Sequence, residues 1–203
     1  MSPARVDRVV VSGVFSLDGQ DFDVDNNVWL IGDDDEVLVI DAPHDVAPIV
    51  GAIGGRRVTA IVLTHGHNDH ITAAVALRAA TGAEIWLHPS DRMLWDVVHP
   101  GAEPDHELSP TVRFRVAGTE LETQHTPGHS PGGVCLYASS LETVFTGDTL
   151  FSGGPGATGR SFSDRPTIEH SIRSELFTLP EDTVVKTGHG DDTTIAAELR
   201  NVG

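Results

Sequence analysis

The chain has 203 residues, enough for one domain with an adequate core, and we expect a single domain over residues 1–203. Its 13 Lys and Arg stand against 30 Asp and Glu, and the resulting net charge of −17 disfavours nucleic acid as a partner. No apolar signal core or membrane-spanning stretch is present, so we expect a cytoplasmic protein without a membrane partner. Its oligomeric state is left open.

The first half of the chain alternates strand-like and helix-like segments. This alternation predicts an α/β arrangement. The expected strands are 8–17, 24–31, 37–40, 58–63 and 83–87, and the expected helices are 46–53, 71–81 and 89–97. In the last helix we expect Met93, Leu94, Val97 and Val98 to point inward. Trp95 and Trp86 fit either the core or a pocket wall, with the core favoured.

The segment Thr64-His65-Gly66-His67-Asn68-Asp69-His70 follows the strand at 58–63 and precedes an Ala-rich helix. His65 and His67 are two residues apart, so both imidazoles can face one side of an extended loop. Three histidines and a carboxylate supply nitrogen and hard oxygen donors, which suit Zn(II), Fe(II) or Mn(II). A polar surface turn is the alternative, but turns gain nothing specific from three histidines.

The second half predicts antiparallel strands at 112–116, 120–125, 133–138 and 142–146, a helix at 165–177, a strand at 183–186 and a final helix ending at Arg200. His129, Asp148 and His189 each follow a strand-like run and lie in a Gly-containing turn. Such repeated placement predicts one site along one edge of a sheet. Cys135 lies within a strand-like run, where a small core residue is favoured over a nucleophile.

Several other polar residues have two interpretations. Asp41 leaves the strand at 37–40, where it either orients a metal-binding imidazole or forms a turn. Arg160 closes a glycine-rich segment that we interpret as a mobile wall of the substrate cleft; it pairs either with an anionic substrate group or with Asp164. Histidines without motif context are expected on the surface or in loops: His88, His99 and His106.

The HxHxDH pattern at 65–70, the later His129, Asp148 in a TGDT turn and His189 in a GHG turn together resemble the metallo-β-lactamase superfamily over nearly the whole chain. The resemblance implies a four-layer αββα sandwich, with the metal site at one edge of two facing sheets. It also implies that His65, His67 and His129 bind one metal ion, that Asp69, His70 and His189 bind a second, and that Asp148 bridges both. Two divalent ions are expected, with zinc favoured and iron or manganese as alternatives.

Within the superfamily, the expected ligand set is most similar to that of glyoxalase II, a hydrolase of acyl-glutathione thioesters. Ala73 replaces a glycine common in its motif, and we expect no C-terminal helical domain. The runs VDNNVWL, HTPGHSPGGVC and TGDTLFSGGPGATGRS resemble actinobacterial hydrolases associated with mycothiol-dependent formaldehyde oxidation. This resemblance implies hydrolysis of a formyl or lactoyl thioester of a small thiol by a metal-bound hydroxide, with Asp69 as the catalytic residue that orients it.

Two rival functions follow from the same scaffold. Persulfide dioxygenases keep one Fe(II) on two histidines and a carboxylate, matched here by His65, His129 and Asp148. A non-catalytic binding protein on this fold is the third possibility, but such a protein is expected to lose ligand positions, and all are filled here.

Overall fold

The computed structural model describes residues 2–202. Its first sheet has six strands in the order β1-β2-β3-β4-β5-β6. The strands are β1 (Arg5–Leu17), β2 (Gln20–Gly32), β3 (Glu36–Ile40), β4 (Arg57–Val62), β5 (Ile85–Leu87) and β6 (His106–Glu107). The long hairpin of β1 and β2 is antiparallel, whereas β3, β4, β5 and β6 run parallel to one another.

The second sheet also has six strands, in the order β14-β13-β10-β9-β8-β7. They are β7 (Arg113–Val116), β8 (Thr119–His125), β9 (Val134–Ala138), β10 (Thr143–Gly147), β13 (Val184–Thr187) and β14 (Thr193–Thr194). Because β9 is antiparallel to both β8 and β10, and β13 is parallel to β10, the strands β8, β10 and β13 run in one direction. Their carboxyl ends therefore lie at the same edge.

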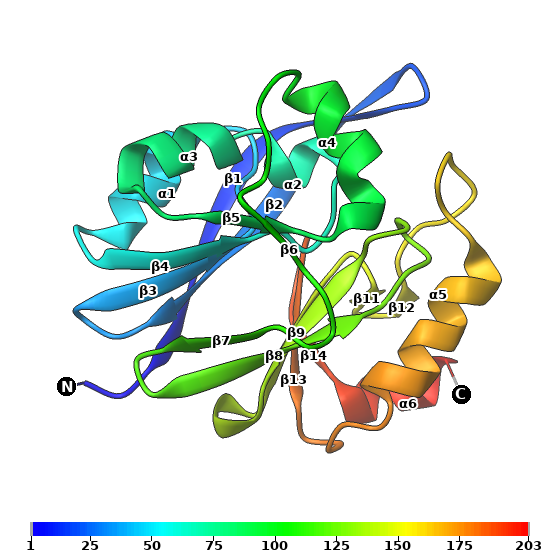
Figure 1. Cartoon of the computed structure of the whole chain (residues 1–203). Coiled ribbons are helices and arrows are strands. Elements are labelled where there is room, and N and C mark those ends of the chain that lie inside the picture. Colours follow the sequence, from blue (N-terminus) through cyan, green and yellow to red (C-terminus); the bar gives the residue numbers. More distant parts are fainter. Residues whose placement is uncertain (1, 203) are drawn as a thin grey trace.

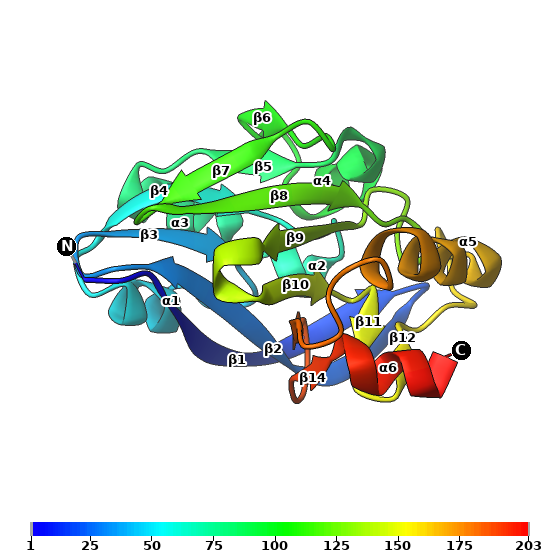
Figure 2. The same cartoon turned by 90° about the horizontal axis from the view of Figure 1, so that it is seen from below.

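Helices cover the outer side of each sheet (Figure 1). The first sheet carries α1 (Val46–Ile53), α2 (Asn68–Ile71), α3 (Ala74–Thr81) and α4 (Arg92–Val98), and the second carries α5 (Arg165–Ser171) and α6 (Ile195–Val202). Figure 2 shows the two sheets and the small hairpin of β11 (Leu150–Phe151) and β12 (Gly154–Pro155) from below. The predicted α/β four-layer sandwich is confirmed.

The side-chain alternation of β3 shows how the layers are held together. Val37 and Val39 pack with Ile49 and Leu77 of the outer helices, whereas Leu38 and Ile40 face the second sheet, where they join Phe145. Because successive side chains of a strand point to opposite faces, a continuous apolar run can fill two core layers. On the outer side of the second sheet, a third cluster joins Cys135 and Val144 to Ile168, Ile172 and Ile195.

Three predicted helices are not continuous α-helices. The segment 71–81 is split into α2 and α3, because the backbone N–H of Ala73 donates to Ala42 O instead of staying within one helix. The segment 89–97 begins with a 3₁₀ turn at Pro89–Asp91 before α4, and the 165–177 helix continues from α5 into a π-helical turn at Ile172–Leu176.

The predicted inward face of α4 is partly wrong. Leu94 and Trp95 are buried, but Met93 is 45% exposed and Val97 is 81% exposed. Only one side of the short α4 meets the core: Leu94, Trp95 and the partly buried Val98 lie on it, whereas Met93 and Val97, four residues apart, share the exposed side. Among the described residues, no helix has the length and apolar composition that a bilayer crossing requires.

Candidate metal centre

Side chains that are scattered along the sequence meet at one edge of the sandwich. His65 and His67 follow β4, His129 follows β8, Asp148 follows β10 and His189 follows β13. The His and Asp side chains form three overlapping groups, and in each group the ligand atoms all lie within 4.8 Å of one another. Together the groups contain all the predicted ligands: His65, His67, Asp69, His70, His129, Asp148 and His189. The shared direction of β8, β10 and β13 brings their loops to this edge.

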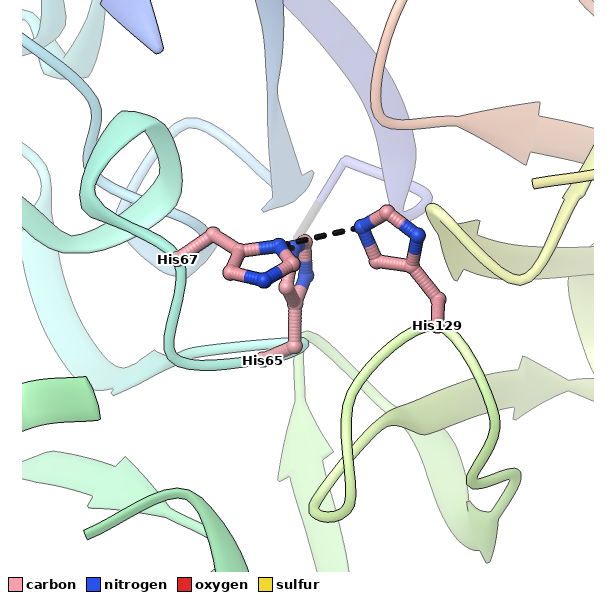
Figure 3. Close-up of side chains that lie close together, drawn as sticks. All are labelled: His65, His67 and His129. Atoms are coloured by element: carbon pink, nitrogen blue, oxygen red, sulfur yellow. Dashed lines mark hydrogen bonds between the residues drawn. The ribbon is translucent and has the colours of Figure 1, made fainter. Parts of the chain in front are cut away.

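The first group consists of three imidazoles (Figure 3). His67 Nδ1 lies 3.1 Å from His65 Nε2 and 3.0 Å from His129 Nε2. His65 and His67 come from one loop and His129 from another, and the rings of His67 and His129 meet edge to face, with planes 88° apart, across the space between these loops (Figure 3). Three ring nitrogens are thus directed at one point.

The second group contains one carboxylate and two imidazoles. His189 Nε2 lies 3.3 Å from Asp69 Oδ2 and 3.3 Å from His70 Nε2. His70 is fully buried, because α2 presents it to the inner side of the loop. This group has the donor types that suit a hard or borderline divalent cation.

Asp148 lies between the two groups. Its Oδ1 is 3.3 Å from His70 Nε2, and its Oδ2 is 3.4 Å from His189 Nε2 and 3.5 Å from His129 Nε2. One carboxylate thus reaches an imidazole of the first group and both imidazoles of the second. This position is the one that the predicted bridging role of Asp148 requires.

The far nitrogens of the imidazoles are held by outer partners. His129 Nδ1 donates to Ala157 O and His189 Nδ1 donates to Asp25 O, each over 2.8 Å. His70 Nδ1 lies 2.8 Å from Asp41 Oδ2. A carbonyl can only accept, so in neutral His129 and His189 the proton sits on Nδ1 and the lone pair on Nε2 points into the cluster.

These contacts test whether the residues fit a pair of metal ions. Lone pairs of several nitrogens and carboxylate oxygens converge, and Asp69 Oδ1 is buried without a hydrogen-bond partner. Converging acceptors repel each other unless protons or cations lie between them. The donor set therefore fits divalent cations, and the assignment of individual ligands stays a prediction.

The electrostatics of the metal-free cluster divide the histidines into two kinds. Burial lowers the pKa of His67 to about 3, and burial and the neighbouring imidazoles hold the pKa of His65 well below its usual range. At His189 burial acts in the same direction, but Asp148 and Asp69 outweigh it and raise the pKa to about 10. The same carboxylates and Asp41 raise the pKa of His70 well above its usual range, despite burial.

Asp41 makes contacts that match the positioning role considered for it. Its carboxylate accepts from Thr64 N (2.7 Å) and Thr64 Oγ1 (2.8 Å) in addition to its contact with His70. It also has a positive φ of 64°, so it shapes the turn after β3. Both interpretations of Asp41 thus describe features of the same residue.

Two buried polar residues near the cluster lie outside the predicted ligand set. Asn26 Nδ2 is 3.1 Å from Asp69 Oδ2 and 3.2 Å from His70 Nε2, while its Oδ1 lies 2.8 Å from His44 Nε2. Asp91 lies behind the histidine loops and accepts from Gly66 N. Asn26 belongs to the VDNNVWL run, which offered a signal, whereas nothing in the local sequence distinguishes Asp91.

A small pocket opens beside the first histidine group, with Phe15, His67, His129 and Arg160 among its lining residues. Arg160 does not pair with Asp164, which instead caps α5 through Thr167. Its guanidinium lies 4.6 Å from the centroid of the Phe22 ring and donates to Gln20 Oε1. Arg160 therefore joins the glycine-rich segment to the β1–β2 hairpin at the rim of the pocket.

The remaining histidines lie outside the cluster. His88 was expected on the surface or in a loop; it lies in the loop after β5, where it is buried and stacks on His125, with ring centroids 4.1 Å apart and planes 9° apart. Burial and the nearby His125 lower the pKa of His88 to about 4. The stacking of the two rings explains why a polar residue can occupy this position.

Gly188 offers a selective test of the cluster. A Cβ at this position would lie 2.2 Å from Asp148 Oδ1 and 2.8 Å from His70 Cε1. Gly188→Ala is therefore expected to weaken metal binding about 10- to 100-fold and to destabilise the fold by about 1–3 kcal/mol. Metal titration and chemical denaturation measure the two effects.

Gly51→Ala is the matched control, because Gly51 is exposed in α1 and an added Cβ meets nothing within 4 Å. It is expected to stabilise the fold by about 0.5–1 kcal/mol and to leave metal binding unchanged. Wild-type metal affinity in Gly188→Ala would contradict the placement of Asp148.

Comparisons with known proteins agree with this geometry. Hydroxyacylglutathione hydrolase GloC of Haemophilus influenzae is 32% identical over 191 residues, which cover 86% of this chain and 90% of that protein. TTHA1623, whose crystal structure was solved in a di-iron-bound form, is 30% identical in sequence. The two structures superpose with a TM-score of 0.78 over 88% of this chain and 94% of that chain. ETHE1 from Myxococcus xanthus is 26% identical with a TM-score of 0.73, covering 96% of this chain and 83% of that one.

The family model for the metallo-beta-lactamase superfamily matches residues 22–189, which include every member of the cluster. The match, the four-layer fold and the His and Asp donors at its edge identify the same family. The chain belongs to the metallo-beta-lactamase superfamily.

Proposed function

We propose that this protein is a metal-dependent hydrolase that cleaves a formyl or lactoyl type thioester of a low-molecular-weight thiol. The observation that carries the proposal is the pair of donor groups joined by Asp148. The similarity to a relative named hydroxyacylglutathione hydrolase supports the substrate class. The similarity of its sequence runs to mycothiol-associated hydrolases makes mycothiol a candidate carrier alongside glutathione.

Two divalent ions, with zinc favoured over iron or manganese, would be held by His65, His67 and His129 and by Asp69, His70 and His189, with Asp148 shared. Such a pair of ions supplies a Lewis acid for the acyl oxygen and activates water near neutral pH. The proposed reaction forms a bond between the water oxygen and the acyl carbon and breaks the carbon–sulfur bond. Its products are a carboxylic acid and a thiol.

Asp69 is the proposed catalytic residue of the chain. Its Oδ2 is held by Asn26 Nδ2 at 3.1 Å, whereas its buried Oδ1 makes no hydrogen bond. A carboxylate with one fixed and one free oxygen can orient an attacking water and accept its proton. Because a thiolate is a good leaving group, the reaction needs no strong protein acid.

The pocket beside His67 is the proposed place of the substrate. The Phe15 ring lies 5.3 Å from the His67 ring and gives the pocket an apolar wall. Arg160 adds a fixed positive charge at the rim, held by Phe22 and Gln20. We propose that Arg160 binds an anionic or carbonyl group of the thiol carrier.

A persulfide dioxygenase is the second candidate. The likeness to ETHE1 favours it, as does the proximity of His129 to Asp148, which with His65 would provide two imidazoles and a carboxylate for one Fe(II). The second donor group of Asp69, His70 and His189 is also complete, and a one-iron mechanism leaves it without a role. The two donor groups thus favour hydrolysis.

The proposal is tested with metal-replete protein and a panel of S-formylmycothiol, S-lactoylglutathione and a small persulfide. We expect release of free thiol from at least one thioester, loss of this activity after chelation, and no oxygen uptake with the persulfide. Comparing the two carriers separates mycothiol from glutathione. Oxygen consumption with one iron per chain, or no turnover of any thioester, would refute the proposed activity.

A further inference from the structure

Asp91 ends the 3₁₀ turn before α4 and is fully buried. Its carboxylate accepts three hydrogen bonds: from Gly66 N at 2.7 Å, from Ser130 Oγ at 2.7 Å and from Gly132 N at 2.6 Å. Among the ion pairs of residues 2–202, none involves Asp91. Its charge is therefore stabilised mainly by these three donors.

The donors belong to the two loops that carry the first histidine group. Gly66 lies between His65 and His67, and Ser130 directly follows His129. The sequence separation between Asp91 and its partners is 25, 39 and 41 residues, so the contacts connect segments that are otherwise far apart in the chain. One carboxylate thus joins both loops from behind the imidazoles.

The two glycines are required for this close approach. A Cβ on Gly66 would lie 2.9 Å from Asp91 Cβ, and a Cβ on Gly132 would lie 2.7 Å from Asp91 Cγ. Neither glycine has a positive φ, so space rather than backbone conformation explains the absence of a side chain. The loops are shaped to receive this carboxylate.

Asp41 provides the comparison. It contacts His70 of the second group directly and the loop residue Thr64, whose Oγ1 lies 3.1 Å from His65 Nδ1. Asp91 makes no hydrogen bond to a residue of the second group. Asp41 therefore contacts the second group directly and the first only through Thr64, whereas the side-chain contacts of Asp91 reach only the loops of the first group.

We propose that Asp91 is a positioning residue that sets the spacing between the His65–His67 loop and the His129 loop, and so controls the affinity of the first metal group alone. This inference rests on the proposed metal centre. A three-imidazole site requires its nitrogens at fixed mutual distances. Besides the backbone bond from Val134 N to Thr64 O, Asp91 joins the two loops behind the imidazoles, so replacing its carboxylate changes that spacing.

Asp91→Asn is the direct test. The amide keeps the size of the side chain, but its NH₂ group must face a backbone N–H or the Ser130 hydroxyl, so at least one loop loses an acceptor. We expect two ions per chain in the wild type and about a 10- to 100-fold loss of affinity for one of them in the variant. Asp41→Asn is expected to weaken the other ion more strongly.

The affected group is identified by double variants. Asp91→Asn combined with His189→Ala is expected to weaken both ions, whereas Asp91→Asn combined with His129→Ala should bind like His129→Ala alone. Ser130→Ala removes only one of the three donors, so a smaller loss of affinity for the same ion is expected. If Asp91→Asn does not fold, Ser130→Ala provides the test in its place.

Hydrogen exchange in metal-free protein provides a readout independent of metal and activity. The amides of Gly66 and Gly132 should exchange faster in Asp91→Asn than in the wild type or in Asp41→Asn. If the wild type binds two ions and Asp91→Asn binds both with unchanged affinity, the inference is overturned. If the wild type binds no ion, the proposed function fails. If the Gly66 and Gly132 amides of metal-free Asp91→Asn exchange hydrogen at the wild-type rate, the positioning role is overturned independently of metal binding.

Discussion

Asp148→Asn is expected to remove thioester hydrolysis and the binding of at least one metal ion. Asp148 reaches His129 in one group and His70 and His189 in the other, so its loss affects both. Because replacing an outer partner of a ligand alone costs about 10- to 100-fold, we expect kcat/KM to fall by more than about 100-fold. Steady-state kinetics at saturating metal and elemental analysis of the same sample measure the effect.

The matched control is Asp182→Asn, the same chemical change at an exposed residue. This variant should retain wild-type kinetics and metal content. An Asp148→Asn protein that is folded, holds two ions and hydrolyses the thioester at the wild-type rate would contradict the bridging position of Asp148.

Metal affinity is expected to rise steeply with pH. In the metal-free cluster, Asp148 and Asp69 outweigh burial and raise the pKa of His189 to about 10, so this imidazole is protonated at neutral pH. His70 is shifted in the same direction. A histidine must lose its extra proton before it can bind a metal ion, so each proton that binding displaces adds about tenfold in apparent affinity per pH unit below the raised pKa.

Competition titrations with a chromophoric chelator between about pH 6 and pH 8 measure this slope, and proton release in weakly buffered solution gives an independent count. His106→Ala is the control, because His106 pairs with Glu84 away from the cluster. The metal affinity of this variant should depend on pH with the same slope as that of the wild type. An affinity that does not change with pH, with no acidification on adding metal, would contradict the charge balance described for His70 and His189.

Local patterns predict the strands, the α/β arrangement and one site at a sheet edge, whereas the four-layer sandwich and the individual ligands are implied by the resemblance to the metallo-β-lactamase superfamily. Apolar runs such as 37–40 identify buried strands. Strands that run in the same direction end at the same edge of the sheet, so the polar residues that directly follow them lie at that edge. The position of His129 at this edge of its sheet follows from this rule. Its role as a ligand stays a prediction.

Features that depend on contacts between distant segments could not be predicted in this way. Asp91 acts on two backbone N–H groups and one serine hydroxyl, and such partners leave no pattern in the sequence. The break between α2 and α3 depends on the bond from Ala73 N to Ala42 O. The exposed Met93 and Val97 show that a helical apolar pattern does not determine which side meets the core.

Anomalous diffraction from crystals of the metal-loaded protein tests the central claim most directly. We expect two peaks about 3.5–4 Å apart, one beside His65, His67 and His129 and the other beside Asp69, His70 and His189, with Asp148 between them. A single ion, or ions bound away from these side chains, would contradict the proposed two-metal centre.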